Sequence, residues 1–198
     1  LKYTRDVYYI GNQEMARVRK GEITFYNLDG EEIEKELKTV EWDAEAAEKS
    51  GYEHFMIKEI HEQPKAVSDT LNSVIKDGMI DLSEVGLSEE EIKEISQIYI
   101  VACGSAYHVG VAAQYVMEDL ARIPVRVELA SEFRYRNPIL DPKGLVVIIS
   151  QSGETADSLA ALRESKKQGV KTLGIVNVIG SSIAREADNV YYALAGPE

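Results

Sequence analysis

Three hydroxyl side chains, an amide and a glycine lie together in residues 150–155, which read Ser-Gln-Ser-Gly-Glu-Thr. Small hydroxyls and loop N–H groups bind anions without crowding them, and this loop has no lysine of the kind that a nucleotide-binding P-loop carries. A neutral, serine-rich loop suits the phosphate monoester of a small molecule. The alternative is an ordinary helix-capping turn, in which serine and threonine are also common.

The segments on either side of this loop predict how it is held. Residues 145–149 are five apolar residues, four of them β-branched, which is typical of a buried strand in a parallel sheet. Residues 155–168 follow with the apolar period of a helix, which Gly169 ends. In such a unit the first N–H groups of the helix converge on the loop, and the helix dipole favours negative charge there.

The C-terminal half of the sequence repeats this alternation of strand and helix. Strands are expected at residues 98–102, 125–129, 145–149, 171–176 and 190–194, and helices at residues 105–122, 131–136, 155–168 and 181–186. Such β–α–β repeats with right-handed crossovers predict the α/β fold class. We expect a five-stranded parallel, flavodoxin-like sheet in the order 2-1-3-4-5, with helices on both faces.

That strand order predicts a second loop beside the first. Ligands of such sheets bind beyond the carboxyl ends of the strands where the order reverses, which is between strands one and three. The loop after strand one is residues 103–106, Cys-Gly-Ser-Ala, and it also enters a helix. Two Gly/Ser loops at one switch point favour the phosphate interpretation over the capping turn.

The N-terminal part predicts a different architecture. Residues 1–41 alternate apolar and polar residues around a hairpin signal at Asp29-Gly30, which indicates a small antiparallel meander of three or four strands, one of them over residues 31–40. Residues 42–51 predict a linker or a short helical connection. Pro64 is expected to open a helix that ends at Asp77-Gly78, and residues 88–91 are a capping box.

Composition narrows the class of protein. The net charge of the 198 residues is −12 at pH 7, which disfavours a nucleic-acid or anionic-membrane partner. The single cysteine, Cys103, excludes an internal disulfide and a multi-cysteine zinc site, and it fits a reducing cytosol. The sequence contains no run of about 18 apolar residues, which a membrane-spanning helix would need. The sequence predicts no metal and no cofactor. Because Leu1 leads directly into strand-like sequence, we expect a fragment of a longer protein.

Four segments in register resemble one protein family: residues 102–108, 130–136, 150–157 and 177–182. The two loops in this setting resemble the sugar isomerase (SIS) domain, which binds phosphosugars. Together the segments are similar to the glutamine–fructose-6-phosphate aminotransferase (isomerising) family. By this resemblance residues 1–42 are the end of a glutaminase domain, residues 43–88 a linker with connecting helices, and residues 89–198 a first SIS domain.

The resemblance implies an enzyme that converts fructose 6-phosphate and glutamine to glucosamine 6-phosphate and glutamate, as a cytoplasmic homodimer. The substrate-binding residues it implies are Cys103, Gly104, Ser105, Ser150, Gln151, Ser152 and Thr155. The family usually has threonine at the position of Ser105, which keeps the hydroxyl, and some members have serine where Ala106 offers only its backbone. The family's nucleophilic cysteine and its acid–base residues would lie before residue 1 and after residue 198. We therefore expect sugar-phosphate binding that is weak or absent, no catalytic residue in this fragment and no turnover.

Several reactive side chains have simpler explanations. Cys103 ends a buried strand and is expected to be a packed residue rather than a nucleophile. Glu154 is expected to satisfy the dipole of the helix that it precedes. Arg134 and Arg136 are expected in exposed ion pairs, and the three histidines predict no zinc site.

Two other functions compete with the aminotransferase. A non-catalytic SIS sensor would bind a phosphosugar to regulate another process, but such a regulator normally carries a DNA-binding helix-turn-helix where this sequence has an acidic β meander. A stand-alone phosphosugar isomerase would leave the glutaminase-like residues 1–42 unexplained.

Overall fold

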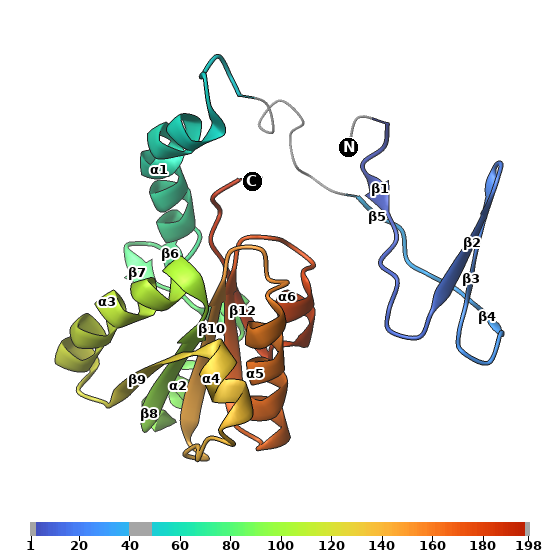
Figure 1. Ribbon diagram of the computed structural model, residues 1–198. Coiled ribbons are helices and arrows are strands. Elements are labelled where there is room, and N and C mark those ends of the chain that lie inside the picture. The colour runs from blue at the N-terminus through green and yellow to red at the C-terminus, as the bar shows by residue number, and fades with distance from the viewer. Residues whose placement is uncertain (1–2, 40–48, 197–198) are drawn as a thin grey trace. The chain divides into compact units, whose positions relative to one another are not determined.

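The computed structural model describes residues 3–39 and 49–196, and it divides into two compact units (Figure 1). Of the described residues, the smaller unit contains residues 3–39 and 49–54, and the larger contains Phe55–Gly196. Most of the connection that the sequence predicts at residues 42–51 lies outside the described residues. Among the described residues, none of the helices is both long and apolar enough to cross a membrane.

The smaller unit is antiparallel β structure, as the alternating sequence predicts. Its elements are β1 (Asp6–Val7), β2 (Met15–Arg19), β3 (Glu22–Tyr26), β4 (Glu32–Ile33) and β5 (Lys38–Thr39). Strands β2, β3 and β4 form one sheet, and β1 pairs separately with β5. The single strand expected over residues 31–40 is therefore wrong. Its first part pairs with β3 and its last part with β1, so the chain changes partner between them.

Helix α1 (Phe55–Asn72) opens the larger unit and runs straight through Pro64. The expectation that Pro64 begins a helix is wrong. An interior proline removes the hydrogen bond that its own N–H would donate to residue 60 and crowds the carbonyl there, yet this 18-residue helix continues on both sides of it. The apolar period continues across the proline, from Met56 and Ile60 to Val67 and Leu71.

The expected helix end at Asp77-Gly78 is a hairpin turn instead. It joins β6 (Ile75–Lys76) to β7 (Met79–Ile80), which pair antiparallel. Both turn residues have positive φ, 52° for Asp77 and 77° for Gly78, as a type I′ hairpin requires. Asp-Gly between two strand-like segments is the usual signal for this turn, but the same two residues also suit the C-terminus of a helix.

A short helical segment, η2 (Ser83–Val85), leads into α2 (Glu89–Glu94). The capping box predicted for α2 is confirmed. Ser88 Oγ accepts from the Glu91 N–H at 3.2 Å, and Glu91 Oε2 accepts from the Ser88 N–H at 2.9 Å.

The rest of the larger unit confirms the predicted parallel sheet. Its strands are β8 (Gln97–Ala102), β9 (Val125–Leu129), β10 (Gly144–Ser150), β11 (Lys171–Val176) and β12 (Asn189–Tyr192). They lie in the order β9-β8-β10-β11-β12, and every adjacent pair is parallel. The order of the first two strands is reversed relative to the others, so the switch point lies between β8 and β10, as predicted.

Helices cover both faces of this sheet (Figure 1). They are α3 (Gly104–Ala121), α4 (Ala130–Tyr135), α5 (Ala156–Lys167) and α6 (Ser182–Glu186). One face packs against α4, α5 and α6 through Phe133, Leu162 and Ile183. The opposite face packs against α3 through Ala113 and Met117. Because α5 lies across β10 and α3 across β8, their first turns are held at the carboxyl ends of two neighbouring strands.

Gly110 sets how closely α3 approaches the sheet. A Cβ at this position would lie 2.8 Å from Ile100 Cγ2 and 3.0 Å from Val127 Cγ1. Helix propensity alone predicts that Gly110→Ala stabilises the protein by about 1 kcal/mol. Overpacking against two β-branched side chains outweighs that gain, so we expect the free energy of unfolding to fall by about 1–3 kcal/mol.

Urea denaturation measures this difference, and Ala112→Gly at an exposed position of the same helix calibrates the propensity contribution. An increase in stability for Gly110→Ala would show that α3 does not pack this closely.

Asp188 joins β11 to the start of β12 and makes stability depend on pH. Burial raises the pKa of Asp188, but hydrogen bonds from Lys166 and Thr172 outweigh it and hold this pKa below its ordinary value of 3.8. A carboxylate with a lowered pKa stabilises the folded state above its unfolded pKa, and the stabilisation is lost as pH falls through the folded pKa. Asp188→Asn is therefore expected to be less stable than wild type at pH 7, and the difference should shrink below about pH 4.

Chemical denaturation at pH 7, 5 and 3 measures this effect. A wild-type-to-variant difference that stays constant over that range would contradict the assignment.

Candidate functional site

The two predicted loops lie side by side at one edge of the sheet. Ile149 near the end of β10 pairs with Ala102 at the end of β8, so residues 103–106 and 150–155 leave the sheet together. Helices α3 and α5 begin directly after these loops. The first N–H groups of each helix have no acceptor within their own helix and carry its positive dipole end. We call residues 150–155 the cradle.

Hydrogen bonds within the cradle leave hydroxyl protons available. Ser152 Oγ accepts from the Glu154 N–H at 3.2 Å, and Ser150 Oγ accepts from the Gly153 N–H at 3.1 Å. Ser150 Oγ and Thr155 Oγ1 lie 3.1 Å apart, and either can donate to the other. A hydroxyl that accepts a backbone N–H keeps its own proton for donation. The Ser152 hydroxyl therefore keeps its proton for donation. In the Ser150–Thr155 pair one hydroxyl proton also remains available. If the buried Ser150 donates to Thr155, that proton belongs to Thr155.

Gly153 brings the cradle into direct contact with Ser181, in the loop between β11 and α6. Its φ is +67°, and a Cβ there would lie 2.0 Å from Ser181 Oγ and 2.5 Å from Ser181 Cβ. Only glycine fits both the backbone conformation and the space. Ser181 is 3% exposed, and its hydroxyl has no hydrogen-bond partner among the described residues.

Glu154 points to a different helix from the one that the sequence suggests. Its Oε1 accepts from the Ser182 N–H at 2.7 Å, at the first residue of α6 rather than α5. The expectation linked Glu154 to the helix that directly follows it. The bond to α6 joins residues 28 positions apart, and no sequence signal reports it.

The first loop holds the other expected residues. Gly104 begins α3 with φ +57°, and Ser105 is exposed in the first turn of that helix. Cys103 is partly buried and packs against the core, as expected for a packed residue. Ser158 Oγ of α5 lies 3.9 Å from Cys103 Sγ, so this contact connects the first loop to the helix that the cradle enters. Sequence reasoning missed Ser158, because a buried serine on a helix resembles any small core residue.

Two arginines form the ion pairs expected of them. Arg134 Nη1 lies 2.7 Å from Asp157 Oδ1, in the first turn of α5, and Arg136 pairs with Glu128. The carboxylate of Asp157, two residues past the cradle, is thus compensated by a cation. In the described part of the chain, no group of three or more His, Cys, Asp or Glu side chains is arranged to hold a metal ion.

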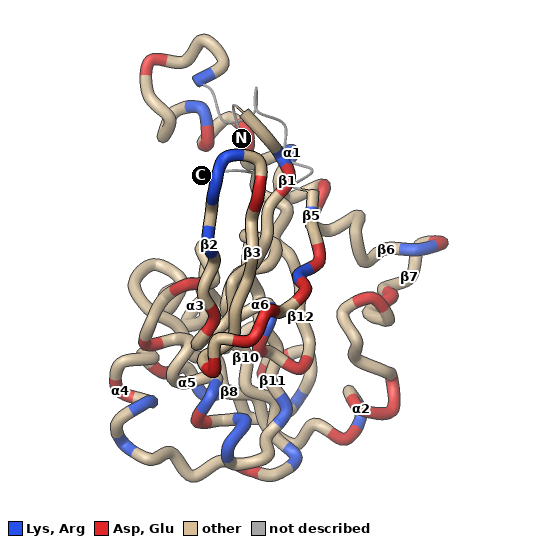
Figure 2. Tube along the Cα trace, turned by 90° about the vertical axis from the view of Figure 1, so that its right-hand side faces the viewer, with Lys and Arg blue, Asp and Glu red and all other residues tan. Residues whose placement is uncertain are grey.

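Charged residues are distributed over the larger unit rather than gathered at the cradle (Figure 2). Lysines and arginines alternate with acidic residues along the trace, and many form ion pairs such as Arg163–Glu186 at 2.6 Å. The polar groups of the cradle are therefore mainly hydroxyl and N–H donors, without a cluster of cations among them.

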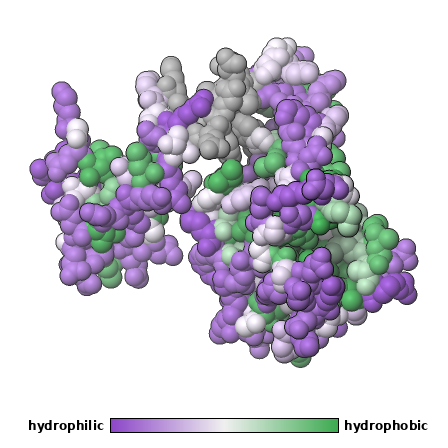
Figure 3. Space-filling model, turned by 180° about the vertical axis from the view of Figure 1, so that it is seen from behind, coloured by the Kyte–Doolittle hydropathy of each residue, from purple (hydrophilic) through white to green (hydrophobic). Residues whose placement is uncertain are grey.

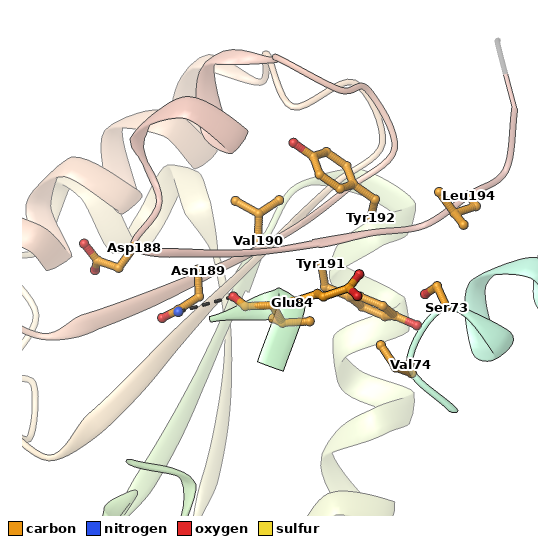
Figure 4. Close-up of a pocket in the computed structure, with 10 residues that line it drawn as sticks. Ser73, Val74, Glu84, Asp188, Asn189, Val190, Tyr191, Tyr192 and Leu194 are labelled. Carbon is orange, nitrogen blue, oxygen red and sulfur yellow. Dashed lines mark hydrogen bonds between the residues drawn. The ribbon is translucent and has the colours of Figure 1, made fainter. Parts of the chain in front are cut away.

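A separate hollow of about 270 Å³ lies beside the edge strand β12 (Figure 4). Its lining comes from the residues that follow α1, from η2 and from β12 with its flanking residues, and it includes Glu84 and Asp188. Asn189 donates from Nδ2 to the Val85 carbonyl at 3.3 Å and to the Gly86 carbonyl at 2.7 Å, which holds η2 against the strand. None of the residues that line this hollow belongs to the cradle, so the two are separate features.

The contact between Gly153 and Ser181 can be tested by paired substitutions. Gly153→Ala is expected to lower the free energy of unfolding by about 2–5 kcal/mol, because it adds overpacking to left-handed strain. Combining it with Ser181→Gly removes the overlapping atoms and leaves only the strain. The two substitutions should therefore couple favourably by about 1–3 kcal/mol in a double-mutant cycle measured in urea. Additive effects would show that the two residues are not in contact.

Comparisons with known proteins agree with this geometry. The SIS domain family matches residues 91–198, which is more than half of the chain. Glutamine–fructose-6-phosphate aminotransferases (isomerising) from Caldanaerobacter subterraneus subsp. tengcongensis and Clostridium acetobutylicum are each 55% identical to it over 199 aligned residues. Each alignment covers 100% of this chain and 33% of the relative, so the chain spans about a third of the length of these relatives.

A solved structure is similar as well. The C-terminal domain of glucosamine-fructose-6-phosphate aminotransferase from Francisella tularensis is 47% identical, with a TM-score of 0.71 over 76% of this chain and 42% of that one. The parallel sheet, the two Gly/Ser loops at its switch point and the family match agree with one another: the chain belongs to the SIS domain family.

Proposed function

We propose that this chain supplies the sugar-phosphate cradle of a glutamine–fructose-6-phosphate aminotransferase. The parent enzyme would convert fructose 6-phosphate and glutamine to glucosamine 6-phosphate and glutamate. The observation that carries the proposal is the cradle itself, a hydroxyl-rich loop at the switch point of an SIS sheet. Relatives that are 55% identical over the whole of this chain bear the name of that enzyme.

In this proposal the phosphate lies against residues Ser150, Gln151, Ser152 and Thr155. The first turn of α5 offers backbone N–H groups, while Ser152 and the Ser150–Thr155 pair offer hydroxyl protons. A phosphate dianion accepts hydrogen bonds only, so a set of donors without carboxylate acceptors matches it. The backbone carbonyls of Gln151 and Gly153 are already bonded to other N–H groups, which keeps them from facing the anion.

The sugar would lie toward Cys103, Gly104 and Ser105. Ser105 is exposed in the first turn of α3 and can donate to or accept from a sugar hydroxyl. Gly104 leaves open space where a Cβ would stand, so the ligand can approach the backbone closely. The thiol of Cys103 is turned toward Ser158 and the core and provides a wall rather than a nucleophile.

We also propose the place of this chain in the parent enzyme. Residues 1–42 would be the end of a glutaminase domain, residues 43–88 a linker with connecting helices, and residues 89–198 the first SIS domain. Because the chain spans a third of the relatives' length, other parts of the parent would supply the acid–base groups and the glutamine-cleaving nucleophile. The isolated chain should then release no glucosamine 6-phosphate from fructose 6-phosphate and glutamine.

We further propose that the parent enzyme is a cytoplasmic homodimer. The larger unit exposes many apolar side chains (Figure 3), and on α3 they include Val109, Tyr115, Val116 and Leu120. Exposed apolar surface of this kind is typical of protein that is covered in an assembly. Light scattering of the parent enzyme measures its oligomeric state directly.

Calorimetric titration with fructose 6-phosphate tests the cradle. Removing a hydroxyl that donates to a dianion loses a charge-assisted hydrogen bond, so Ser152→Ala and Thr155→Val should each weaken binding by about 10- to 100-fold. Thr155→Ser keeps the hydroxyl and should bind like wild type. Ser68→Ala removes an exposed hydroxyl from α1 and serves as the matched control.

Unphosphorylated fructose should not bind measurably in the same experiment. Equal binding of fructose and fructose 6-phosphate, or full affinity in both hydroxyl-deficient variants, would contradict the proposed site. Binding of the phosphosugar by a parent protein that has no aminotransferase activity would favour the sensor function instead.

A further inference from the structure

Three hydrogen bonds tie the cradle to the residue that follows β11 and to the first turn of α6. The Asn177 N–H donates to the Gln151 carbonyl at 3.1 Å, and the Ile183 N–H donates to the Gly153 carbonyl at 3.0 Å. The third bond is the one from the Ser182 N–H to Glu154 Oε1 at 2.7 Å. Two of these bonds use backbone groups alone, so Glu154 makes the one whose side chain can be changed by substitution.

Helix α6 is anchored at its other end as well. Arg163 of α5 donates from Nε and Nη2 to the two carboxylate oxygens of Glu186, at 2.7 and 2.6 Å. Lys166 Nζ donates to the Glu186 carbonyl at 2.6 Å. Two residues therefore hold α6 at its two ends. Glu154 of the cradle holds the N-terminal end, and Arg163 of α5 holds the C-terminal end.

The position of Glu154 is unfavourable for a residue that contacts the ligand. A carboxylate repels a phosphate dianion and cannot donate to it. In the structure this carboxylate instead accepts a backbone N–H from outside the cradle. This hydrogen bond fixes Glu154 directly beside Gly153. Gly153 in turn packs so closely against Ser181 that a Cβ would not fit.

We infer that Glu154 is a positioning residue, which holds the cradle backbone against α6 and so keeps the donors of residues 152–155 aimed at the phosphate. This inference rests on the proposed function for its ligand, but the bond to Ser182 exists without one. Glu154 acts through the backbone that it holds and does not touch the substrate. Preorganised donors bind more tightly because binding does not have to order them.

Two substitutions that remove the same charge should therefore differ in their effect on the affinity for fructose 6-phosphate. By charge alone, both Glu154→Gln and Glu154→Ala would tighten phosphate binding. Glutamine keeps an oxygen that can accept from the Ser182 N–H, whereas alanine has none. We expect Glu154→Ala to weaken binding of fructose 6-phosphate by about 5- to 20-fold, and Glu154→Gln to stay within about twofold of wild type.

Glu186→Ala is the matched control for a general loosening of α6. It breaks the anchor to Arg163 at the opposite end of the helix, away from the cradle. We expect it to lower stability in urea while leaving the affinity for fructose 6-phosphate within about twofold of wild type.

Amide hydrogen exchange of the 198-residue chain without ligand gives a second readout. In Glu154→Ala the amides of Ser182 and of residues 152–155 should exchange faster, while in Glu154→Gln and Glu186→Ala the cradle amides should keep their wild-type rates. If the parent enzyme does not bind fructose 6-phosphate, the proposed function fails, and the exchange rates of the 198-residue chain alone decide the inference about Glu154.

Several results would overturn the inference. Exchange in Glu154→Ala at the wild-type rate would show that the bond does not order the cradle. Tighter binding by both Glu154 variants would show that charge repulsion is its main effect. Equal losses in Glu154→Ala and Glu154→Gln, or in Glu186→Ala, would show that the acceptor oxygen of Glu154 has no specific role.

Discussion

The contact between Gly153 and Ser181 is the constraint on which the geometry of the cradle depends. There is no room for even a methyl group between them. The position of the loop after β11 therefore fixes the position of the loop after β10. The Gly153 carbonyl then meets the Ile183 N–H, and the Glu154 carboxylate reaches the Ser182 N–H. These contacts hold the serine-rich loop against α6, which would keep its donors in place before a ligand binds.

Electrostatic compensation around the cradle makes the proposed anion site compatible with a net charge of −12. The acidic residue within the cradle, Glu154, accepts from the N–H of Ser182, and Asp157, two residues past the cradle, pairs with Arg134. The remaining groups that face the loop's interior are hydroxyls and helical N–H groups, which donate. Local arrangement of dipoles thus opposes the global charge, since fields from distant surface charges are screened by water and salt.

The parallel sheet was predictable because its signals are local. The two central strands, β8 and β10, are apolar and rich in β-branched residues, and the crossover helices show their own period, so order and direction follow from general rules of connection. The errors occurred where one local signal has two meanings. Asp77-Gly78 suits both a helix C-terminus and a hairpin, and Pro64 suits both a helix start and a tolerated interior position. Residues 31–40 alternate like one strand, yet they pair with two different partners.

By itself the sequence determined the two Gly/Ser loops, their place at the switch point and the family that they resemble, because residue types and strand order are written along the chain. Only the tertiary structure decided what those loops touch. Glu154 bonds to a residue 28 positions away, and Cys103 meets Ser158 across 55 positions. Such contacts arise because parallel neighbours bring distant loops to the same edge of the sheet, and no local pattern specifies which side chains then meet.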